Sequence, residues 1–353
     1  MKRFAALFAT VLVVLFLLLG AGFAPRAEAA PEIKSGLKVA SINAINTHGW
    51  RFVYDKQMRE VAEEYKAKGI ISEFTELCPN MDQAVEAQMF ETCVNEGYDV
   101  ILLNAVGSSG LDNQIEMALA AGIKVIFVDN LYPYEGVLGI QTDQRIWAGN
   151  ACQALVDFLG GKGKIVMLNG VLGATGSSLR YDTWDGILKN YPGIEVVFKG
   201  AHSWSQVESK KVMSEFLASG IEYDAILTEE GCVGILEAIE EAKAPYPKFM
   251  TSDEEVGYLR MLARINKDKP VINFYIIENP PGIGATALKL AVRAASGWEF
   301  KPESLEGGVY LYKPNYIVTP DTLAKAIEDT KDMEDTDQVS AYITDEVADA
   351  AFK

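Results

Sequence analysis

Short apolar runs alternate with amphipathic stretches along almost the whole chain. The runs are rich in β-branched residues and lie at 38–45, 100–104, 124–129, 163–169, 195–198, 225–228, 249–252 and 271–277. Stretches with helical periodicity lie between them, at 51–68, 82–96, 110–121, 145–159, 206–219 and 231–241. Since each strand is followed by a helix that must cross back over the sheet, this order predicts the α/β class with parallel sheets.

The first 29 residues have the layout of a cleaved secretory signal peptide. Lys2 and Arg3 precede an apolar block at 4–23, and Ala27-Glu28-Ala29 then forms a small-x-small cleavage pattern. The alternative is an uncleaved membrane anchor, because the apolar block is nearly long enough to span a bilayer. The cleavage pattern and the acidic residues after it favour removal, which predicts a periplasmic protein that begins at Ala30.

The charge of the chain excludes two classes of partner. The formal net charge is −17, and residues 1–29 carry three basic residues and one acidic residue, so the remainder carries −19. So acidic a protein repels nucleic acid and anionic lipid. We therefore expect a protein that binds neither. We also expect a monomer.

Polar and aromatic residues recur where the predicted strands end. Ligands of open parallel sheets bind beyond the carboxyl ends of the strands, so these residues are the first candidates for a site. They are Asn46 to Arg51, Asp129-Asn130, Arg180-Tyr181 after a Gly/Ser loop, Ser203-Trp204, Glu229-Glu230, Asp253-Glu254 and Glu278-Asn279.

This set of side chains suits a carbohydrate. Sugar hydroxyls both donate and accept hydrogen bonds, and carboxylates, Asn and Arg pair with them, often in bidentate fashion. Sugar rings also present C–H faces that pack against aromatic rings. Trp50 and Trp204 are the expected walls of such a pocket.

The chain resembles the type I periplasmic sugar-binding proteins, the ribose- and galactose-binding group that serves ABC transporters. The resemblance covers nearly all of residues 36–318. Its most specific segment is GYDVILLNAVGSSGLDNQIEMALAAGIKVIFVDN, and KVASINAINTHGW, GVLGATGSSLRYDTWDGI, YDAILTEEGCVGILEAIEEA, FMTSDEE and ENPPGIGATALKLAVRAASG add to it.

The resemblance implies two similar lobes, each a parallel sheet flanked by helices, joined by a three-strand hinge. The N-terminal lobe is expected at 30–141 plus 279–309, and the C-terminal lobe at 142–278 plus 310–353. The hinge crossings are expected near Gln141–Asp143, Glu278 and Gly308–Leu311.

The resemblance and the strand ends together give one set of ligand-binding residues. Asn130, Thr228 and Glu278 depart from the ribose-binding pattern, which leaves the sugar open, and Tyr181 competes with Arg180 because the preceding loop is longer. The predicted residues are Asn46, Thr47, His48, Trp50, Arg51, Asp129, Asn130, Arg180, Tyr181, Trp204, Thr228, Glu229, Asp253 and Glu278.

Several of these residues also have a purely structural interpretation. Trp50 and Trp204 could be core residues, Glu229 could open a helix whose dipole favours an acid, and Asp253 could cap a turn. Asp253 is nevertheless expected to contact the ligand directly, because it follows the apolar run KFMTS at once. The four cysteines allow three disulfide pairings or four thiols.

The sequence offers little chemistry for an enzyme. Only two histidines occur, His48 and His202, and the Gly/Ser loop lacks the phosphate-binding and nucleophile-elbow patterns. We therefore expect no metal, no cofactor and no reaction.

The expected function is capture of a monosaccharide or related polyol between two lobes and its delivery to an ABC permease. One alternative is a sensor that presents the ligand to a chemoreceptor or a histidine kinase. Another is an amino-bearing or cationic ligand, because Glu229, Asp253 and Glu278 would make the cleft acidic.

Overall fold

The computed structural model describes residues 31–46, 49–252 and 254–353. The predicted signal peptide and the predicted site residues Thr47, His48 and Asp253 therefore lie outside the described residues. No helix in the described part of the chain combines the length and the apolar character needed to cross a bilayer.

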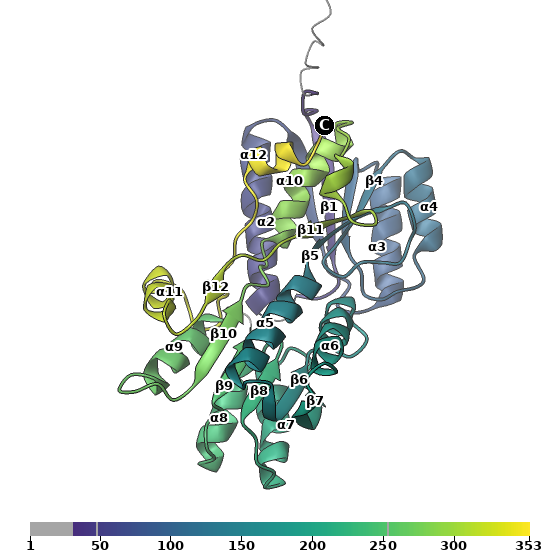
Figure 1. Cartoon of the computed structure of the whole chain (residues 1–353). Coiled ribbons are helices and arrows are strands. Elements are labelled where there is room, and N and C mark those ends of the chain that lie inside the picture. The colour runs from purple at the N-terminus through teal and green to yellow at the C-terminus, as the bar shows by residue number, and fades with distance from the viewer. Residues whose placement is uncertain (1–30, 47–48, 253) are drawn as a thin grey trace, which may run out of the picture. The chain divides into compact units, whose positions relative to one another are not determined.

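The first sheet has six strands, all parallel, in the order β11-β5-β4-β3-β1-β2 (Figure 1). Its central strand β3 is buried along its whole length, which is why it reads as the unbroken apolar run VILLN. The strands are β1 (Leu37–Asn43), β2 (Ile71–Leu77), β3 (Val100–Asn104), β4 (Lys124–Val128), β5 (Leu138–Thr142) and β11 (Val309–Tyr312).

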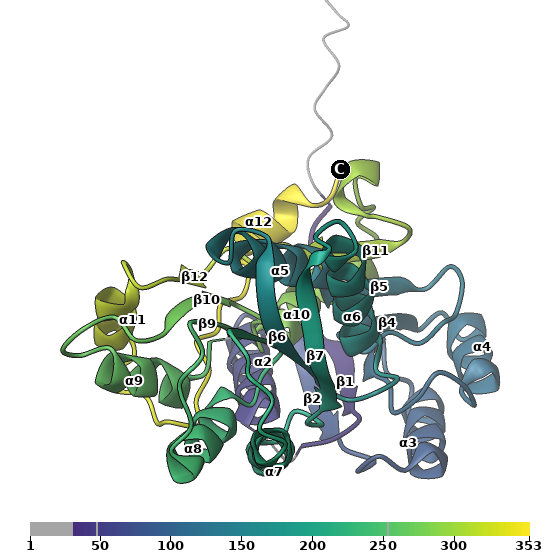
Figure 2. The same cartoon turned by 60° about the horizontal axis from the view of Figure 1, so that its bottom comes forward.

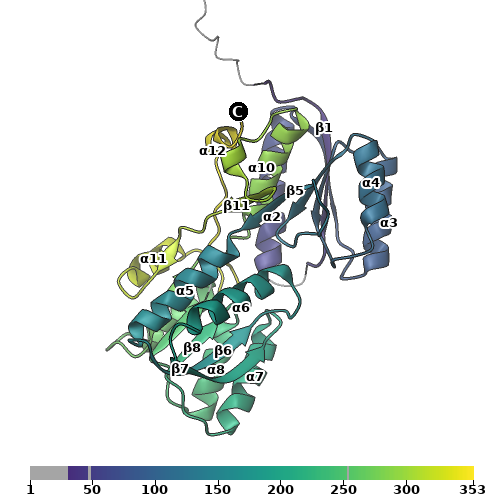
Figure 3. The ribbon, with the colours of Figure 1, turned by 45° about the vertical axis from the view of Figure 1, so that its right-hand side comes forward.

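Helices cover both faces of this sheet (Figure 3). One face carries α2 (Gly49–Ala67), α10 (Ile283–Ala295) and α12 (Asp345–Ala350), and the other carries α3 (Gln83–Asn95) and α4 (Asp112–Ala120). The helix predicted at 51–68 is confirmed as α2, and it buries a stripe from Trp50 to Tyr65 in which Val53 is only partly buried. We call this sheet and its helices the first lobe.

The second lobe repeats the plan with the strand order β12-β10-β9-β8-β6-β7 (Figure 2). Five of its strands are parallel, and the short β12 is antiparallel to β10. The strands are β6 (Lys162–Asn169), β7 (Gly193–Ala201), β8 (Ala225–Thr228), β9 (Phe249–Ser252), β10 (Asn273–Ile277) and β12 (Ile317–Val318).

The helices of the second lobe also divide between two faces. One face carries α5 (Gln144–Phe158) and α6 (Thr175–Leu188), and the other α7 (Gln206–Ala218), α8 (Cys232–Ala242), α9 (Val256–Ile265) and α11 (Leu323–Asp329). A 3₁₀ turn at Pro302–Ser304 completes the regular elements. The predicted α/β fold with two similar lobes is confirmed.

Three connections between the sheets match the predicted hinge, although one is shifted. The chain leaves the first sheet at Asp143, returns after Glu278 and leaves again at 313–316. The segment Gly308–Leu311, predicted as a crossing, instead contributes to β11, which pairs with β5. The boundary expected between residues 309 and 310 thus falls inside a strand of the first sheet.

Two further differences affect the site and the C-terminus. The helix α6 begins at Thr175, so Arg180 and Tyr181 lie on a helix and not on the end of a long Gly/Ser loop. The last residues, expected in the C-terminal lobe, return to the first lobe, where α12 packs on α10. Residues 330–344 therefore form a fourth connection, which the sequence did not predict.

Candidate ligand-binding site

The strand order fixes where each sheet can build a site. In the first sheet the connections from β1 and β3 run in opposite directions, and in the second those from β6 and β8 do the same. Such a switch point leaves a crevice at the carboxyl ends of the two strands. Asn43 and Asn104 end the first pair of strands, and Asn169 and Thr228 end the second.

An ion pair lies at the switch point of the first lobe. Arg51, in the first turn of α2, donates from Nη2 to Oδ2 of Asp129 at 2.8 Å. Asn104 donates to the same oxygen at 3.0 Å and to the carbonyl of Val128 at 3.0 Å. The structure thus brings two predicted residues together and adds Asn104, which ends a buried strand.

The backbone of Asp129 is held in an uncommon conformation. Its φ is +62°, in the left-handed region that Asp tolerates better than most residues. The Gln141 side chain donates to its carbonyl at 2.8 Å. This turn directs the carboxylate toward Arg51.

Some polar atoms of this cluster lack a partner. Arg51 is 7% exposed, yet its Nε and Nη1 donate to none of the described residues, and Oδ1 of Asn104 accepts from none. Buried donors and acceptors that stay unsatisfied cost about 1–3 kcal/mol each, so they usually find a partner. Among the described residues, two donors and one acceptor are therefore left without a partner beside Asp129.

Trp50 lies beside this cluster but is largely covered. Its indole is 5% exposed, stacks on Tyr54 with ring centroids 5.6 Å apart, and donates from Nε1 to the carbonyl of Asn279 at 2.6 Å. The guanidinium of Arg51 lies 4.5 Å from the Trp50 ring centroid. The ring therefore orients Arg51 and ties α2 to the second hinge crossing.

Asn46 faces a small polar cavity of about 160 Å³. It donates to one oxygen of Asp55 at 2.6 Å, and Asn43 donates to the other at 3.0 Å. Burial raises the pKa of Asp55 to about 6. Arg59 and Glu76 close the cavity with an ion pair at 2.9 Å.

The second-lobe cluster is centred on Glu229, which is fully buried. Its Oε2 accepts from Arg180 Nη1 at 3.1 Å and Trp204 Nε1 at 2.9 Å, and its Oε1 accepts from Ser177 at 2.6 Å. Burial by itself would raise the pKa of Glu229, but Arg180 and these hydrogen bonds hold that pKa below its usual value. Glu229 is therefore an anion whose two oxygens are both occupied.

Trp204 reaches Glu229 through a strained turn. Ser203 and Trp204 have φ of +53° and +54°, values uncommon for residues other than glycine. The indole lies so close to Gly170 that a Cβ at residue 170 would stand 1.9 Å from Trp204 Nε1. Only glycine at 170 allows this placement of the ring.

His202 and Thr228 hold the same turn through hydrogen bonds. The Trp204 backbone N–H donates to His202 Nδ1 at 3.2 Å, so the proton of the neutral imidazole lies on Nε2, 3.3 Å from the Thr228 hydroxyl. That hydroxyl donates in turn to the carbonyl of Glu230 at 2.9 Å. Burial lowers the pKa of His202 to about 4, which keeps the ring neutral.

Two residues at the hinge link the clusters. Gln144, the first residue of α5, accepts from Arg180 Nε at 2.7 Å and donates to Oδ1 of Asn279 at 3.0 Å. The Asn279 carbonyl accepts from Trp50, as described above. A continuous hydrogen-bonded path therefore joins Trp50 to Glu229.

Besides Asn46, three predicted residues lie apart from the two clusters. The side chain of Asn130 donates to the backbone carbonyl of Ala105, and the Tyr181 hydroxyl accepts from Lys199 at 2.8 Å. Glu278 is fully buried at the hinge, where its Oε1 accepts from the Tyr312 hydroxyl and from the backbone N–H groups of Asn315 and Tyr316. Arg180, and not Tyr181, joins the Glu229 cluster.

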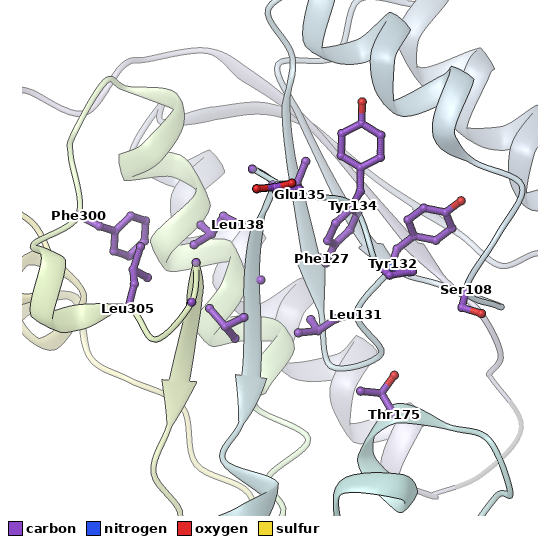
Figure 4. Close-up of a pocket in the computed structure, with 17 residues that line it drawn as sticks. Ser108, Phe127, Leu131, Tyr132, Tyr134, Glu135, Leu138, Thr175, Phe300 and Leu305 are labelled. Carbon is purple, nitrogen blue, oxygen red and sulfur yellow. The ribbon is translucent and has the colours of Figure 1, made fainter.

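A larger cavity lies away from both clusters. It has a volume of about 690 Å³ and is lined mainly by apolar and aromatic side chains beside β5 and β11, such as Phe127, Leu131, Tyr134 and Phe300 (Figure 4). None of the predicted ligand-binding residues lines it. Its only charged side chain is Glu135, so it lacks the convergent polar groups that orient a hydrophilic ligand.

Five polar residues of the site were not predicted from the sequence. Asn43, Asn104 and Asn169 end buried strands, and this was the usable signal, since a polar residue that closes an apolar run at a carboxyl end is a site candidate. Ser177 and Gln144 had no such signal. They reach the cluster because α6 begins early and because α5 begins directly after the hinge.

Comparisons with known proteins agree with this architecture. The model of the family described as "Periplasmic binding protein domain" matches residues 39–299. A xylitol-binding protein of Mycolicibacterium smegmatis is 30% identical over 167 residues, which cover 46% of this chain and 48% of that protein. The match therefore spans about half the length of that relative.

Solved structures share the fold at low sequence identity. An ABC transporter solute binding protein from Thermobispora bispora has a TM-score of 0.75 and 21% identity, covering 89% of this chain and 94% of that one. The fructose binding periplasmic domain of a hybrid two-component system has a TM-score of 0.70 and 17% identity, covering 84% and 95%.

Proposed function

The chain belongs to the periplasmic binding protein family, and from this premise we propose that it is an extracytoplasmic solute-binding protein for a neutral monosaccharide or polyol. The ligand binds between the lobes, at the two switch points, and biases an existing equilibrium of lobe arrangements. Hinge closure around a ligand is the general behaviour of periplasmic binding proteins, which serve as the standard example of it. The bound form then delivers the ligand to an ABC permease.

One observation carries the choice of a polyhydroxylated ligand. The Asp129 cluster offers donors on Arg51 and an acceptor on Asn104 that no described residue uses. A hydroxyl group can accept from the first and donate to the second at the same time. Two adjacent hydroxyls would satisfy all three atoms.

The charge balance of the clusters supports a neutral ligand. Arg51 pairs with Asp129, Arg180 pairs with Glu229, and Glu278 is engaged at the hinge by three donors of the chain itself. Of the three acids expected to make the cleft acidic, Glu229 is thus paired with a cation and Glu278 accepts hydrogen bonds through Oε1, while Asp253 lies outside the described residues. A cationic ligand would find no uncompensated carboxylate at Glu229.

A thermal-shift screen followed by calorimetry tests this proposal. The panel pairs xylitol, the ligand in the name of a 30% identical relative, and aldopentoses with amino-substituted analogues of the same size. A ligand that binds only the native state raises the melting temperature with its concentration. We expect neutral members to bind and Arg51→Lys to weaken them, because a lysine has neither Nε nor Nη1 of the guanidinium. Binding confined to the amino analogues contradicts the proposal.

A sensor protein is a second candidate for the partner that receives the bound ligand. The same fold occurs in a periplasmic domain of a two-component system, so presentation to a chemoreceptor or a histidine kinase is the alternative to delivery. Reconstituted ATPase stimulation by an ABC permease distinguishes the two. We propose no catalysis, because the neutral His202 is used to hold a backbone turn and the Glu229 oxygens are both occupied.

Export completes the proposal. Lys2-Arg3, the apolar block and Ala27-Glu28-Ala29 support cleavage after Ala29 and a periplasmic, monomeric mature protein that does not bind nucleic acid. N-terminal sequencing of the exported protein should give Ala30. An intact Met1 on exported material contradicts this part.

A further inference from the structure

The chain crosses between the lobes a fourth time, after α11. We define the C-terminal strap as residues 330–344, which join α11 in the second lobe to α12 in the first. Leu323 and Ala326 of α11 belong to the core of the second sheet, and Ala348 of α12 belongs to the core of the first. Both ends of the strap are thus anchored, each in a different lobe.

The first half of the strap is bonded to the second lobe. The carbonyls of Asp335 and Asp337 accept from the backbone N–H groups of Gly257 and Val256 at 2.8 and 3.0 Å, at the N-terminus of α9. Val339 donates to the carbonyl of Glu254 at 3.3 Å. These bonds satisfy helix N–H groups that have no partner within α9.

The second half is bonded to the first lobe and the hinge. Ser340 donates to Oε1 of Gln57 on α2 at 2.7 Å and accepts from the N–H of Gly282, before α10, at 2.8 Å. Ile343 donates to the hydroxyl of Thr286 on α10 at 3.3 Å. The hydrogen-bond partners of the strap backbone and of Ser340 change from the second lobe to the first between Val339 and Ser340.

Three glycines make room for the strap backbone. A Cβ at Gly282 would stand 2.2 Å from the Ala341 carbonyl oxygen, one at Gly49 would stand 2.3 Å from that of Thr336, and one at Gly257 would stand 2.9 Å from that of Asp335. None of the three has a positive φ, so backbone conformation does not require glycine there. Glycine is required there because the strap backbone lies where a Cβ would otherwise stand.

We propose that the C-terminal strap is a fourth hinge element that restrains lobe movement and thereby sets ligand affinity. The contact at Gly49 gives the reason for the second part, because Gly49 directly precedes Trp50 and Arg51 of the first-lobe cluster. The effect on affinity rests on the proposed function, whereas the restraint itself does not. A restraint that pre-organises the lobes lowers the ordering cost of binding.

Ser340→Ala tests the restraint, and Ser219→Ala is its matched control. Ser219 also donates one hydrogen bond and accepts another, to Phe216 and from Ile221, but both partners lie in the second lobe. The full-length mature protein without ligand is compared by small-angle scattering and by amide hydrogen exchange. Neither readout requires a known ligand.

We expect Ser340→Ala alone to move the scattering profile away from that calculated for this structure and to speed exchange at Gly282 by about fivefold, as expected for loss of a typical hydrogen bond. Its Kd for xylitol or the best ligand of the panel should rise about two- to fivefold. If scattering and exchange match those of the wild type and Ser219→Ala, the strap is no restraint. A changed profile with no binding of any panel member refutes the proposed function and leaves the restraint standing.

Gly282→Ala gives a second test that displaces the strap through its backbone. The added methyl would meet Ala341, whereas Gly186→Ala adds a methyl to α6 with no atom within 4 Å. We expect the same change in scattering from Gly282→Ala as from Ser340→Ala, and none from Gly186→Ala. Should Gly282→Ala fail to fold, Ser340→Ala decides, and a folded Gly282→Ala with wild-type scattering contradicts the proposal.

Discussion

At the scale of single residues, Glu229 positions other side chains of the second-lobe site. All four of its side-chain partners, Arg180, Trp204, Ser177 and Asn169, are groups of the chain itself. A carboxylate so fully occupied has little capacity left for a ligand hydroxyl. Its role is therefore to hold the guanidinium and the indole in place.

The first prediction concerns Glu229→Gln. The variant keeps the shape but leaves the Arg180 charge buried without its partner, and breaking a buried pair in this way costs about 3–5 kcal/mol. In urea unfolding without ligand, the free energy of unfolding should fall by about that amount. Glu237→Gln, which breaks an exposed pair with Lys210, is the control and should lose at most about 1 kcal/mol. Wild-type stability together with lost binding would instead make Glu229 a ligand contact.

The second prediction concerns the pH dependence of stability through Glu86. This side chain is 1% exposed and accepts one bond, from the Val106 N–H at 2.8 Å. Burial raises its pKa to about 7. Between its ordinary value and pH 7 the folded protein holds more protons than the unfolded chain, so this contribution to stability is present at low pH and is lost as the pH rises through 7.

Glu86→Gln removes that titration while keeping the acceptor for Val106. We expect the free energy of unfolding of the variant, relative to that of the wild type, to rise by roughly 2 kcal/mol from pH 5 to pH 8. The difference between the two proteins is the quantity to measure, because His202, with its lowered pKa, contributes with the opposite sign in both. A difference that stays constant with pH contradicts the prediction.

The third prediction rests on the sequence alone, because Asp253 lies outside the described residues. Asp253 follows the buried strand β9 at a carboxyl end, so Asp253→Asn should remove a charged acceptor of the ligand. We expect about tenfold weaker binding in calorimetry, with an unchanged melting temperature in the absence of ligand. The reverse result, a lower melting temperature and unchanged affinity, indicates a turn cap.

At the scale of elements, the packing of α10 on α2 depends on one glycine. A Cβ at Gly284 would stand 2.6 Å from the Tyr54 ring and 2.8 Å from Met58. The two helices can therefore approach this closely only without a side chain at residue 284. The crossing holds the first turn of α2, and with it Trp50 and Arg51, against the sheet.

The fourth prediction compares two Gly→Ala changes in helices. Gly284→Ala gains helix propensity but overpacks the crossing, so we expect a net loss of about 1–3 kcal/mol. Gly186→Ala, on the open face of α6, should gain about 0.5–1 kcal/mol from propensity alone. Urea unfolding of both variants measures the contrast, and equal stabilities would show that the helices move apart freely.

The sequence predicted those elements whose signal is local. Buried parallel strands such as Val100–Asn104 appear as apolar runs, and α2 appears through its 3.6-residue stripe. The second half of the Gly/Ser segment, from Thr175, was wrongly taken as a loop because glycine and serine weaken helix propensity. The helix α6 is held by Trp184, which is fully buried against α5. Tertiary packing overrode local preference there.

The site was harder to predict than the fold, for a physical reason. Position after a strand indicates which residues lie at an edge of a sheet. In the structure Arg51 lies against Asp129 and Arg180 against Glu229. Position after a strand does not indicate which polar groups the protein uses for itself. Glu278 lies at the expected place, yet its Oε1 is engaged by the hinge backbone and by Tyr312.

At the scale of the whole molecule, overall charge and site charge differ. The chain carries −17, but the described clusters at the switch points contain paired charges. Long-range attraction of cations by the acidic surface is screened by salt within about 10 Å at 0.1 M. Hydrogen bonds between buried, paired groups and a neutral ligand are not weakened in this way.

The fifth prediction uses that contrast. The affinity for the best neutral ligand should change by less than about twofold between 0.05 and 0.5 M NaCl. The reason is that the ligand carries no charge that salt could screen, and the charged groups of the two clusters are paired with each other. An amino analogue, attracted by the acidic surface, should bind more weakly as salt rises. Calorimetry of both ligands at several salt concentrations measures the slopes. A steep slope for the ligand that binds best would mean that its charge contributes to recognition, and the unpaired hydrogen-bonding atoms of Arg51 and Asn104 would then not explain the specificity.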